Sequence, residues 1–249
     1  DHVSRTSLLG RSEPAAGGSN RRGRQANIFG PPRDGWPRPP RYVGGGIGMA
    51  SYDTIASHSL PWPYSDMKEG DDRCPGTERW FKFTQSDSYD RDCEDYERIK
   101  QSGDPNAMAL FVSHHPFVIE PLLQLSTLLY QTNRAQEGLS FLKRVLWVFE
   151  CACLNSFLKF DGSATMMDYD LTENERFFAA LFRLVRVSYV AGLTRACLAV
   201  SRLLLNLDPL RDPLNVLLAI DHFALLENNE THDAWLVEFV QSEKMDMFR

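Results

Sequence analysis

The second half of the chain repeats apolar residues at helical spacing from about residue 104 almost to its end. Apolar residues that recur every three or four positions predict amphipathic helices, whereas strict alternation predicts strands. We expect seven helices, over about 105–112, 117–132, 134–157, 172–192, 194–207 and 213–227 and from about 230 onward. No stretch of this half predicts a strand.

Residues with strong terminal preferences support several of these helix boundaries. Asp104 followed by Pro105 is typical of an N-cap and the first helical position. Thr172 and Glu175 have the spacing of a capping box, in which each side chain accepts from the other residue's backbone amide. Gly192 is expected to end the same helix because glycine adopts the left-handed cap conformation readily.

The short connections between these helices predict antiparallel neighbours, and therefore a row of helical hairpins. The fold class that follows is all-α: an α-solenoid of degenerate tetratricopeptide-like hairpins, without a strict period of about 34 residues. We place this helical-repeat domain at 104–249 and expect it to be truncated at its C-terminus. Residues 49–103 form a connector with an acidic entry helix, and residues 1–48 form an extended or disordered segment.

Composition explains why the first 48 residues are expected to stay unfolded on their own. They are rich in Arg, Gly and Pro and poor in branched aliphatic residues, so they bury too little apolar surface to offset their conformational entropy. The glycine-rich GGGIGM at 44–49 does not join a clear strand to a helix, so it predicts a hinge rather than a nucleotide-binding loop.

Charge gives this segment a candidate role. The chain has a net charge of −6, yet between residues 21 and 41 six arginines face one aspartate, which gives +5. Such asymmetry favours an anionic partner, and interleaved aromatic rings can stack on bases. A solvated linker without a ligand remains the alternative. The residues predicted to contact RNA or the ribosome are Arg21, Arg22, Arg24, Trp36, Arg38 and Arg41.

Two helices carry candidate protein-binding residues. On a helical wheel Trp147 falls among polar residues, so it is either a binding anchor or a side chain covered by the 50–84 connector. Arg176, Arg183 and Arg186 lie together opposite the apolar face of their helix, where they can hold phosphate or an acidic partner. A solvated charged face is the alternative.

Asp221 and His222 interrupt the apolar stretch LLLNLDPLRDPLNVLLAIDHFALL. Adjacent helical residues diverge by about 100°, so the two side chains cannot face each other as an acid–base pair. Because this helix is apolar nearly all round, we expect it in the inner layer of the array. Asp221 must then meet an arginine, a backbone amide or a cap, and both residues are assigned a structural role.

The sequence offers little for catalysis or metal binding. Cys151 and Cys153 lack the spacing and the second pair of a structural zinc site, and no nucleophile elbow, phosphate loop or H-E-x-x-H helix occurs. Every apolar run is broken before the roughly 20 residues of a membrane span. We therefore expect a non-enzymatic protein without metal, cofactor or membrane segment. Five scattered cysteines favour reduced thiols in the cytosol or nucleus.

Several segments together resemble a known family. FGPPRDGWPRPP followed by GGGIGM, then ERWFKFTQSDSY, HPFVIEPLLQLSTLL, FLKRVLWVFECA, YDLTENERFFAALFR and NLDPLRDPLNVLLAIDHFALL resemble, in the same order, the transcription factor 25 family over about residues 25–227. The ordered set is more specific than any single segment.

The resemblance implies a non-catalytic scaffold of ribosome quality control. Its implied partners are the large ribosomal subunit with its ribosomal RNA, a listerin-type ubiquitin ligase and ubiquitin, and its implied compartments are the cytoplasm and the nucleus. The alternative that the family suggests is a nuclear transcriptional repressor that acts through protein contacts.

Overall fold

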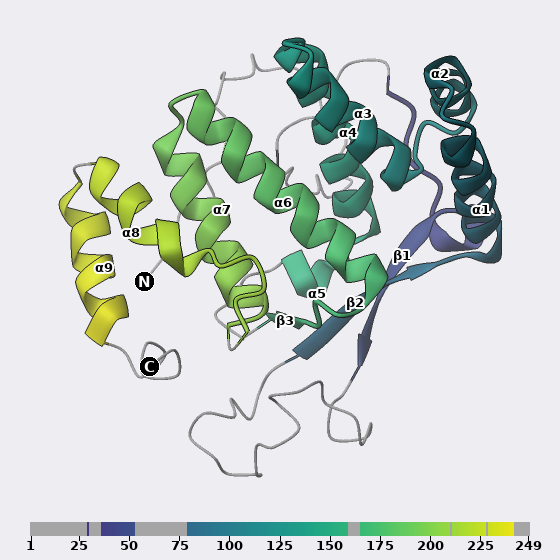
Figure 1. Cartoon of the computed structure of the whole chain (residues 1–249). Coiled ribbons are helices and arrows are strands. Elements are labelled where there is room, and N and C mark those ends of the chain that lie inside the picture. The colour runs from purple at the N-terminus through teal and green to yellow at the C-terminus, as the bar shows by residue number, and fades with distance from the viewer. Residues whose placement is uncertain are drawn as a thin grey trace, which may run out of the picture.

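A computed structural model of the chain describes Phe29 and residues 36–52, 79–158, 165–209, 211–227 and 229–241. Most of these residues are helical (Figure 1). In chain order the elements are η1 (Tyr42–Gly44), β1 (Ile47–Tyr52), β2 (Arg79–Gln85), α1 (Asp87–Ser102), α2 (Pro105–His114), α3 (Ile119–Gln131), α4 (Ala135–Ala152), α5 (Asn155–Leu158), β3 (Thr165–Met167), α6 (Thr172–Val190), α7 (Thr194–Leu207), α8 (Leu217–Leu226) and α9 (Glu230–Gln241).

Helices α3 with α4 and α6 with α7 form the hairpins that the short connections predict (Figure 1). Both turns use a left-handed residue, Asn133 with φ 61° and Gly192 with φ 71°. After α6, the Leu193 amide donates to the Ser188 carbonyl at 2.8 Å and the Gly192 amide to the Tyr189 carbonyl at 3.0 Å. These bonds satisfy the last carbonyls of the helix, which confirms the predicted role of Gly192.

A three-stranded sheet corrects the all-α expectation. β1 pairs antiparallel with β2, from Ile47 opposite Gln85 to Tyr52 opposite Trp80, and β2 pairs parallel with β3. The GGGIGM segment therefore leads into a strand instead of acting as a hinge, and the second half of the chain does contain a strand. These strands are short and pair across long sequence separations, so local periodicity does not reveal them.

The sheet shares one core with the helices. The Phe83 ring of β2 lies 4.7 Å from the Phe149 ring of α4 and 5.3 Å from the Phe177 ring of α6. Phe29, from the N-terminal segment, joins them at 6.4 Å from Phe177 and is 7% exposed. Part of the segment predicted to be disordered is thus built into the hydrophobic core.

Side-chain caps confirm one predicted helix start and correct another. Asp104 caps α2, since its carboxylate accepts from the Asn106 amide at 2.8 Å. Thr172 is the first helical residue of α6 rather than its N-cap, and Leu171 takes the cap position without a side-chain bond. The predicted capping box is therefore wrong, although the start of the helix is right.

Two further boundaries differ from the predicted ranges. The helix expected over 134–157 breaks at Cys153, whose extended backbone (ψ 140°) separates α4 from α5. The helix expected from 213 begins at Leu217, because Asp212 adopts φ 40° and its carboxylate accepts from the Val216 and Leu217 amides, both at 2.9 Å. Among the described residues, no helix combines the length and hydropathy that a membrane crossing requires.

Candidate functional site

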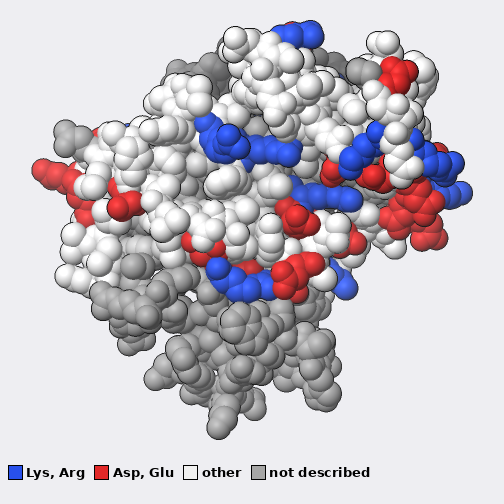
Figure 2. Space-filling model, in the orientation of Figure 1, with Lys and Arg blue, Asp and Glu red and all other residues white. Residues whose placement is uncertain are grey.

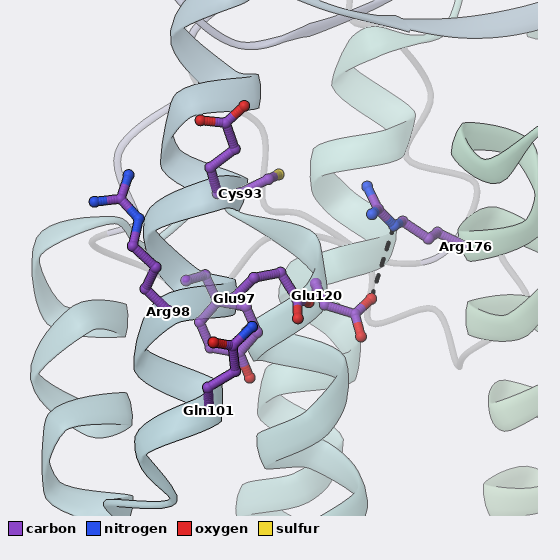
Figure 3. A pocket seen from close by; sticks show the side chains of 8 residues that line it. Cys93, Glu97, Arg98, Gln101, Glu120 and Arg176 are labelled. Carbon is purple, nitrogen blue, oxygen red and sulfur yellow. Dashed lines mark ion pairs between the residues drawn. The ribbon is translucent and has the colours of Figure 1, made fainter.

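A cavity of about 370 Å³ lies where α1, α3 and α6 meet (Figure 3). Helix α1 supplies most of the wall, α3 contributes Glu120 and α6 contributes Arg176. Tyr89 fixes how α1 meets α3, because its hydroxyl accepts from the Ile119 amide at 2.9 Å and so satisfies a donor at the start of α3. The cavity therefore lies between two helices that are joined by a hydrogen bond.

Glu120 is the centre of a polar network on one wall of this cavity. Arg176 Nε lies 3.7 Å from its carboxylate, and Gln124 Nε2 donates to it at 3.1 Å. The Tyr96 hydroxyl donates to the other end of the Gln124 amide at 2.5 Å. Side chains of three helices are thereby fixed relative to one another, which makes the wall preorganised for binding.

The α1 side of the cavity combines a half-buried thiol with exposed charges. The pKa of Cys93 is raised to about 11, chiefly by burial, with smaller contributions from the carboxylates of Asp90, Asp92 and Glu120 that outweigh part of the opposing effect of Arg176. The thiol is consequently protonated at neutral pH and is a poor nucleophile. Glu97 pairs with Lys100 at 3.1 Å at the exposed rim. A protonated thiol beside charged side chains suits reversible binding of a ligand rather than covalent reaction with it.

The three arginines predicted to form one binding stripe have different surroundings on α6. Arg176 lines the cavity, and Arg183 donates to the Leu123 carbonyl of α3 at 2.7 Å, with burial lowering the pKa of its guanidinium. Arg186 is exposed. Basic side chains lie over α6 while acidic side chains gather over α1 (Figure 2). Only part of the predicted stripe is thus open to a partner.

Trp147 is not an exposed anchor, because its side chain is only 7% exposed. The Trp36 ring lies 5.8 Å from it, and the Phe117 ring lies 6.4 Å away. The Arg144 guanidinium sits 5.0 Å from the centre of the Trp36 ring, within cation–π range. Self-coverage by the chain is therefore confirmed, but the cover includes Trp36 from the N-terminal segment, which lies outside the expected 50–84 connector.

The same contacts change the role of the predicted RNA-binding residues. Trp36 is packed against α4 and is half-buried, so its ring is occupied by protein rather than presented for base stacking. Arg38 and Arg41 follow it on the surface and are exposed. The remaining arginines predicted for RNA contact, Arg21, Arg22 and Arg24, lie outside the described residues.

Asp221 and His222 correct the expectation that α8 is an inner helix. Both are exposed, as is Leu218 at 83% of its surface. Asp221 accepts from the amide of His222 at 2.7 Å, and His222 Nε2 lies 3.3 Å from the Tyr189 hydroxyl of α6. Helix α8 buries one side, against α7 and α9 and beside the Tyr189 ring of α6, and leaves Leu218 on its exposed side.

A charge cluster that the sequence analysis missed lies beside the sheet. Arg211 binds Asp168 at 2.7 Å, Asp170 at 2.9 Å and Asp208 at 2.5 Å, and Asp208 is completely buried. The spacing of Asp208 and Arg211 in NLDPLRDP was a local signal for this pair. Within the described ranges, no group of three or more His, Cys, Asp or Glu residues is arranged to hold a metal ion.

Comparisons with known proteins identify relatives of this chain. A family model described as "Transcriptional repressor TCF25" matches residues 81–247. The chain is 29% identical over 150 residues to human "Ribosome quality control complex subunit TCF25", a match that covers 60% of this chain and 22% of the human protein. It is 26% identical over 216 residues to "Ribosome quality control complex subunit 1" of Schizosaccharomyces pombe, with 87% and 29% covered.

A third relative carries a different name. The chain is 28% identical over 148 residues to the "Probable transcription factor claV" of Ampulloclitocybe clavipes, which covers 59% of this chain and 19% of that protein. The chain thus spans less than a third of the length of these curated relatives. No solved structure matches it.

Proposed function

Because the chain belongs to the Tcf25 family, we propose that it acts in ribosome quality control as a non-catalytic scaffold. The observation that carries this proposal is the family match over residues 81–247, the region that runs from β2 to α9 and builds the α1–α3–α6 cavity. The human and fission yeast relatives are both named as ribosome quality control subunits.

In this role the chain binds large ribosomal subunits that carry stalled nascent chains and assists a listerin-type ubiquitin ligase in marking them with ubiquitin. Helices α3 to α9 serve as a degenerate tetratricopeptide-like array whose surfaces hold these partners. We place this function in the cytoplasm, with the nucleus as a second compartment. The surface positions of Arg38, Arg41 and Arg186 support contacts with acidic partners.

Ribosomal RNA is the partner we assign to the N-terminal arginines. Trp36 holds the segment against Trp147, and Arg38 and Arg41 stay exposed immediately after it. The sequence adds three more arginines upstream, at 21, 22 and 24. A basic segment tied to a folded body suits contact with phosphates without base-specific readout.

The non-enzymatic part of the proposal is supported by the chemistry of the cavity. Its thiol is Cys93, and burial raises the pKa of that group to about 11. Glu97 contacts Lys100, and Glu120 contacts Arg176 and Gln124. Covalent catalysis needs an activated nucleophile, which a protonated Cys93 thiol does not supply.

Co-sedimentation with purified large ribosomal subunits tests the proposal. Replacing the arginines at 21, 22, 24, 38 and 41 with alanine should reduce the fraction bound and flatten its salt dependence. Arg134→Ala with Arg195→Ala is the control, because both arginines are exposed and each is paired with a glutamate. Unchanged binding of the five-arginine variant contradicts the RNA assignment, and no binding by the unaltered chain contradicts the ribosome role.

The transcriptional alternative is less favoured, although the family description and the claV relative carry that name. Titration of the chain with ribosomal RNA and with random duplex DNA of equal charge separates the two functions. We expect tighter binding to ribosomal RNA. A clear preference for duplex DNA contradicts the ribosome proposal and supports the alternative.

A further inference from the structure

The α1–α3–α6 cavity has the features of a receptor for a long cationic side chain. Its lining includes the half-buried Cys93 and the aliphatic stems of glutamate, glutamine and arginine side chains, which offer apolar surface. Three glutamates and two arginines also line it, which gives a formal charge of −1. A lysine or arginine side chain has the complementary form, with an aliphatic stem and a charged end.

The carboxylates of this cavity retain capacity for another cation. Arg176 Nε is 3.7 Å from Glu120, a long contact for a charge-assisted hydrogen bond. Arg176 also lies beside Gln85. When the Gln85 amide is turned so that both of its polar atoms are bonded, its oxygen accepts from Arg176 at 2.9 Å and its nitrogen donates to Asp90 at 2.8 Å. Glu97 keeps about half of its side chain exposed while it contacts Lys100. Glu97 and Glu120 are thus the available acceptors.

Helix α1 extends the negative potential beyond the cavity. It carries six acidic and three basic residues, a net charge of −3 over sixteen residues. Acidic side chains accordingly dominate the surface over α1 (Figure 2). Carboxylates around the cavity also act on the half-buried thiol, since Asp90, Asp92 and Glu120 each raise the pKa of Cys93. A basic chain is attracted to this face and an acidic chain is repelled.

We propose that the α1–α3–α6 cavity binds one lysine or arginine side chain from a basic segment of a partner protein. The stem of the incoming side chain lies against Cys93 and the aliphatic stems of the α1 side chains, and its cation meets Glu97 and Glu120, which face the cavity in Figure 3. Neighbouring cations of the same segment lie along the acidic surface of α1. The site does not depend on the ribosome proposal, because it uses none of the arginines assigned to RNA.

Fluorescence anisotropy with a labelled basic peptide tests this site without ribosomes. The probe is Gly-Ser-Lys-Arg-Lys-Ser-Gly, and the matched probe carries norleucine at its three basic positions. We expect saturable binding of the first and none of the second. Glu97→Gln should weaken binding about tenfold, as expected for the loss of one charge-assisted hydrogen bond.

Asp95→Asn is the matched control because it removes the same charge from the same helix. Asp95 pairs with Arg98 at 2.7 Å and does not line the cavity. It should change the affinity by less than about twofold. Equal weakening by Asp95→Asn and Glu97→Gln overturns the proposal, because the peptide would then bind the acidic helix rather than the cavity.

A second variant tests the cavity itself without disturbing the core. Gln101 lies at the exposed end of the lining, so Gln101→Lys places a cation at the entrance and should abolish binding while the circular dichroism spectrum stays unchanged. Tight binding by this variant contradicts the site. Two other results also overturn it. One is a gain in peptide affinity of tenfold or more when the arginines at 21, 22 and 24 are replaced with alanine, because the chain's own segment is then the occupant. The other is dimerisation of the chain, measured by sedimentation, that changes when the peptide is added.

Discussion

Arg211 joins two loops that lie far apart in the sequence. It contacts Asp168 and Asp170, in the segment after β3, and Asp208, at the end of α7. Asp208 is completely buried, so its carboxylate is stabilised by this guanidinium and by other protein partners rather than by water. Removing one member of a buried ion pair leaves an uncompensated charge in a medium of low polarity.

Arg211→Met should therefore lower the free energy of unfolding by about 3 kcal/mol, measured by urea denaturation at neutral pH. Arg195→Met is the control, because Arg195 pairs with Glu227 while 76% of its side chain is exposed. That change should cost less than about 1 kcal/mol. Equal effects of the two substitutions contradict a special role for the Arg211 cluster.

Glu227, the residue after α8, contacts the start of α7. The Thr194 hydroxyl donates to its carboxylate at 2.7 Å and Arg195 at 3.3 Å, and these contacts hold the pKa of Glu227 below its ordinary value of 4.5. A carboxyl group with a depressed pKa in the folded state contributes stability above its unfolded pKa and loses it as the pH falls through the folded value.

Glu227→Gln should thus be less stable than the unaltered chain at neutral pH, and this difference should shrink as the pH falls below 4.5. The measurement is urea denaturation of both proteins at about pH 7 and about pH 3. A difference that is constant with pH, or that grows on acidification, contradicts the assignment.

At the scale of elements, two described residues of the N-terminal segment contact α4. The Phe29 amide faces the Glu150 carboxylate at 3.5 Å, and the Trp36 ring lies against Trp147 and Arg144. Burial of these aromatic side chains stabilises the position of an otherwise polar segment. The exposed Arg38 is positioned by this packing.

Trp36→Ala should release this segment and speed limited proteolysis by trypsin after Arg41 several-fold, with little change in helix content. Val43→Ala is the control, since Val43 is an apolar residue of the same segment with 97% of its surface exposed. Cleavage rates that are the same for both variants contradict the role of Trp36.

At the scale of the molecule, the sheet and the helical hairpins share one core. Asn174 of α6 is completely buried, and it accepts from the Phe83 amide of β2 at 3.0 Å while donating to the Asp168 carbonyl at 2.8 Å. It thereby ties the central strand to the longest helix. Such coupling favours one cooperative unfolding transition rather than the stepwise unfolding of independent repeats.

Asn174→Ala should lower the free energy of unfolding by about 2 kcal/mol, because it leaves a buried amide and a buried carbonyl without these bonds. The urea midpoints from helical circular dichroism and from tryptophan fluorescence should fall together. The exposed Asn106→Ala is the control and should leave both midpoints nearly unchanged. Separate shifts of the two signals contradict the shared core.

The sequence by itself determined the features that depend on a few neighbouring residues. The helical period placed α3, α6 and α7 within about two residues of their bounds, and Asp104 and Gly192 marked helix ends correctly. The ordered motifs also identified the family. Caps and periodicity act within one or two helical turns, so a single sequence contains all the information that they need.

Tertiary structure alone decided which distant segments meet. β2 pairs with β3 some eighty residues away, Trp36 covers Trp147, and Arg183 binds a carbonyl of α3. The cavity likewise joins residues of three helices. A helical wheel gives the direction of a side chain but does not say which element packs against that side. For this reason Asp221 was expected to be buried, whereas the structure exposes it. Burial and pairing depend on the positions of all packed elements together, and no local pattern contains them.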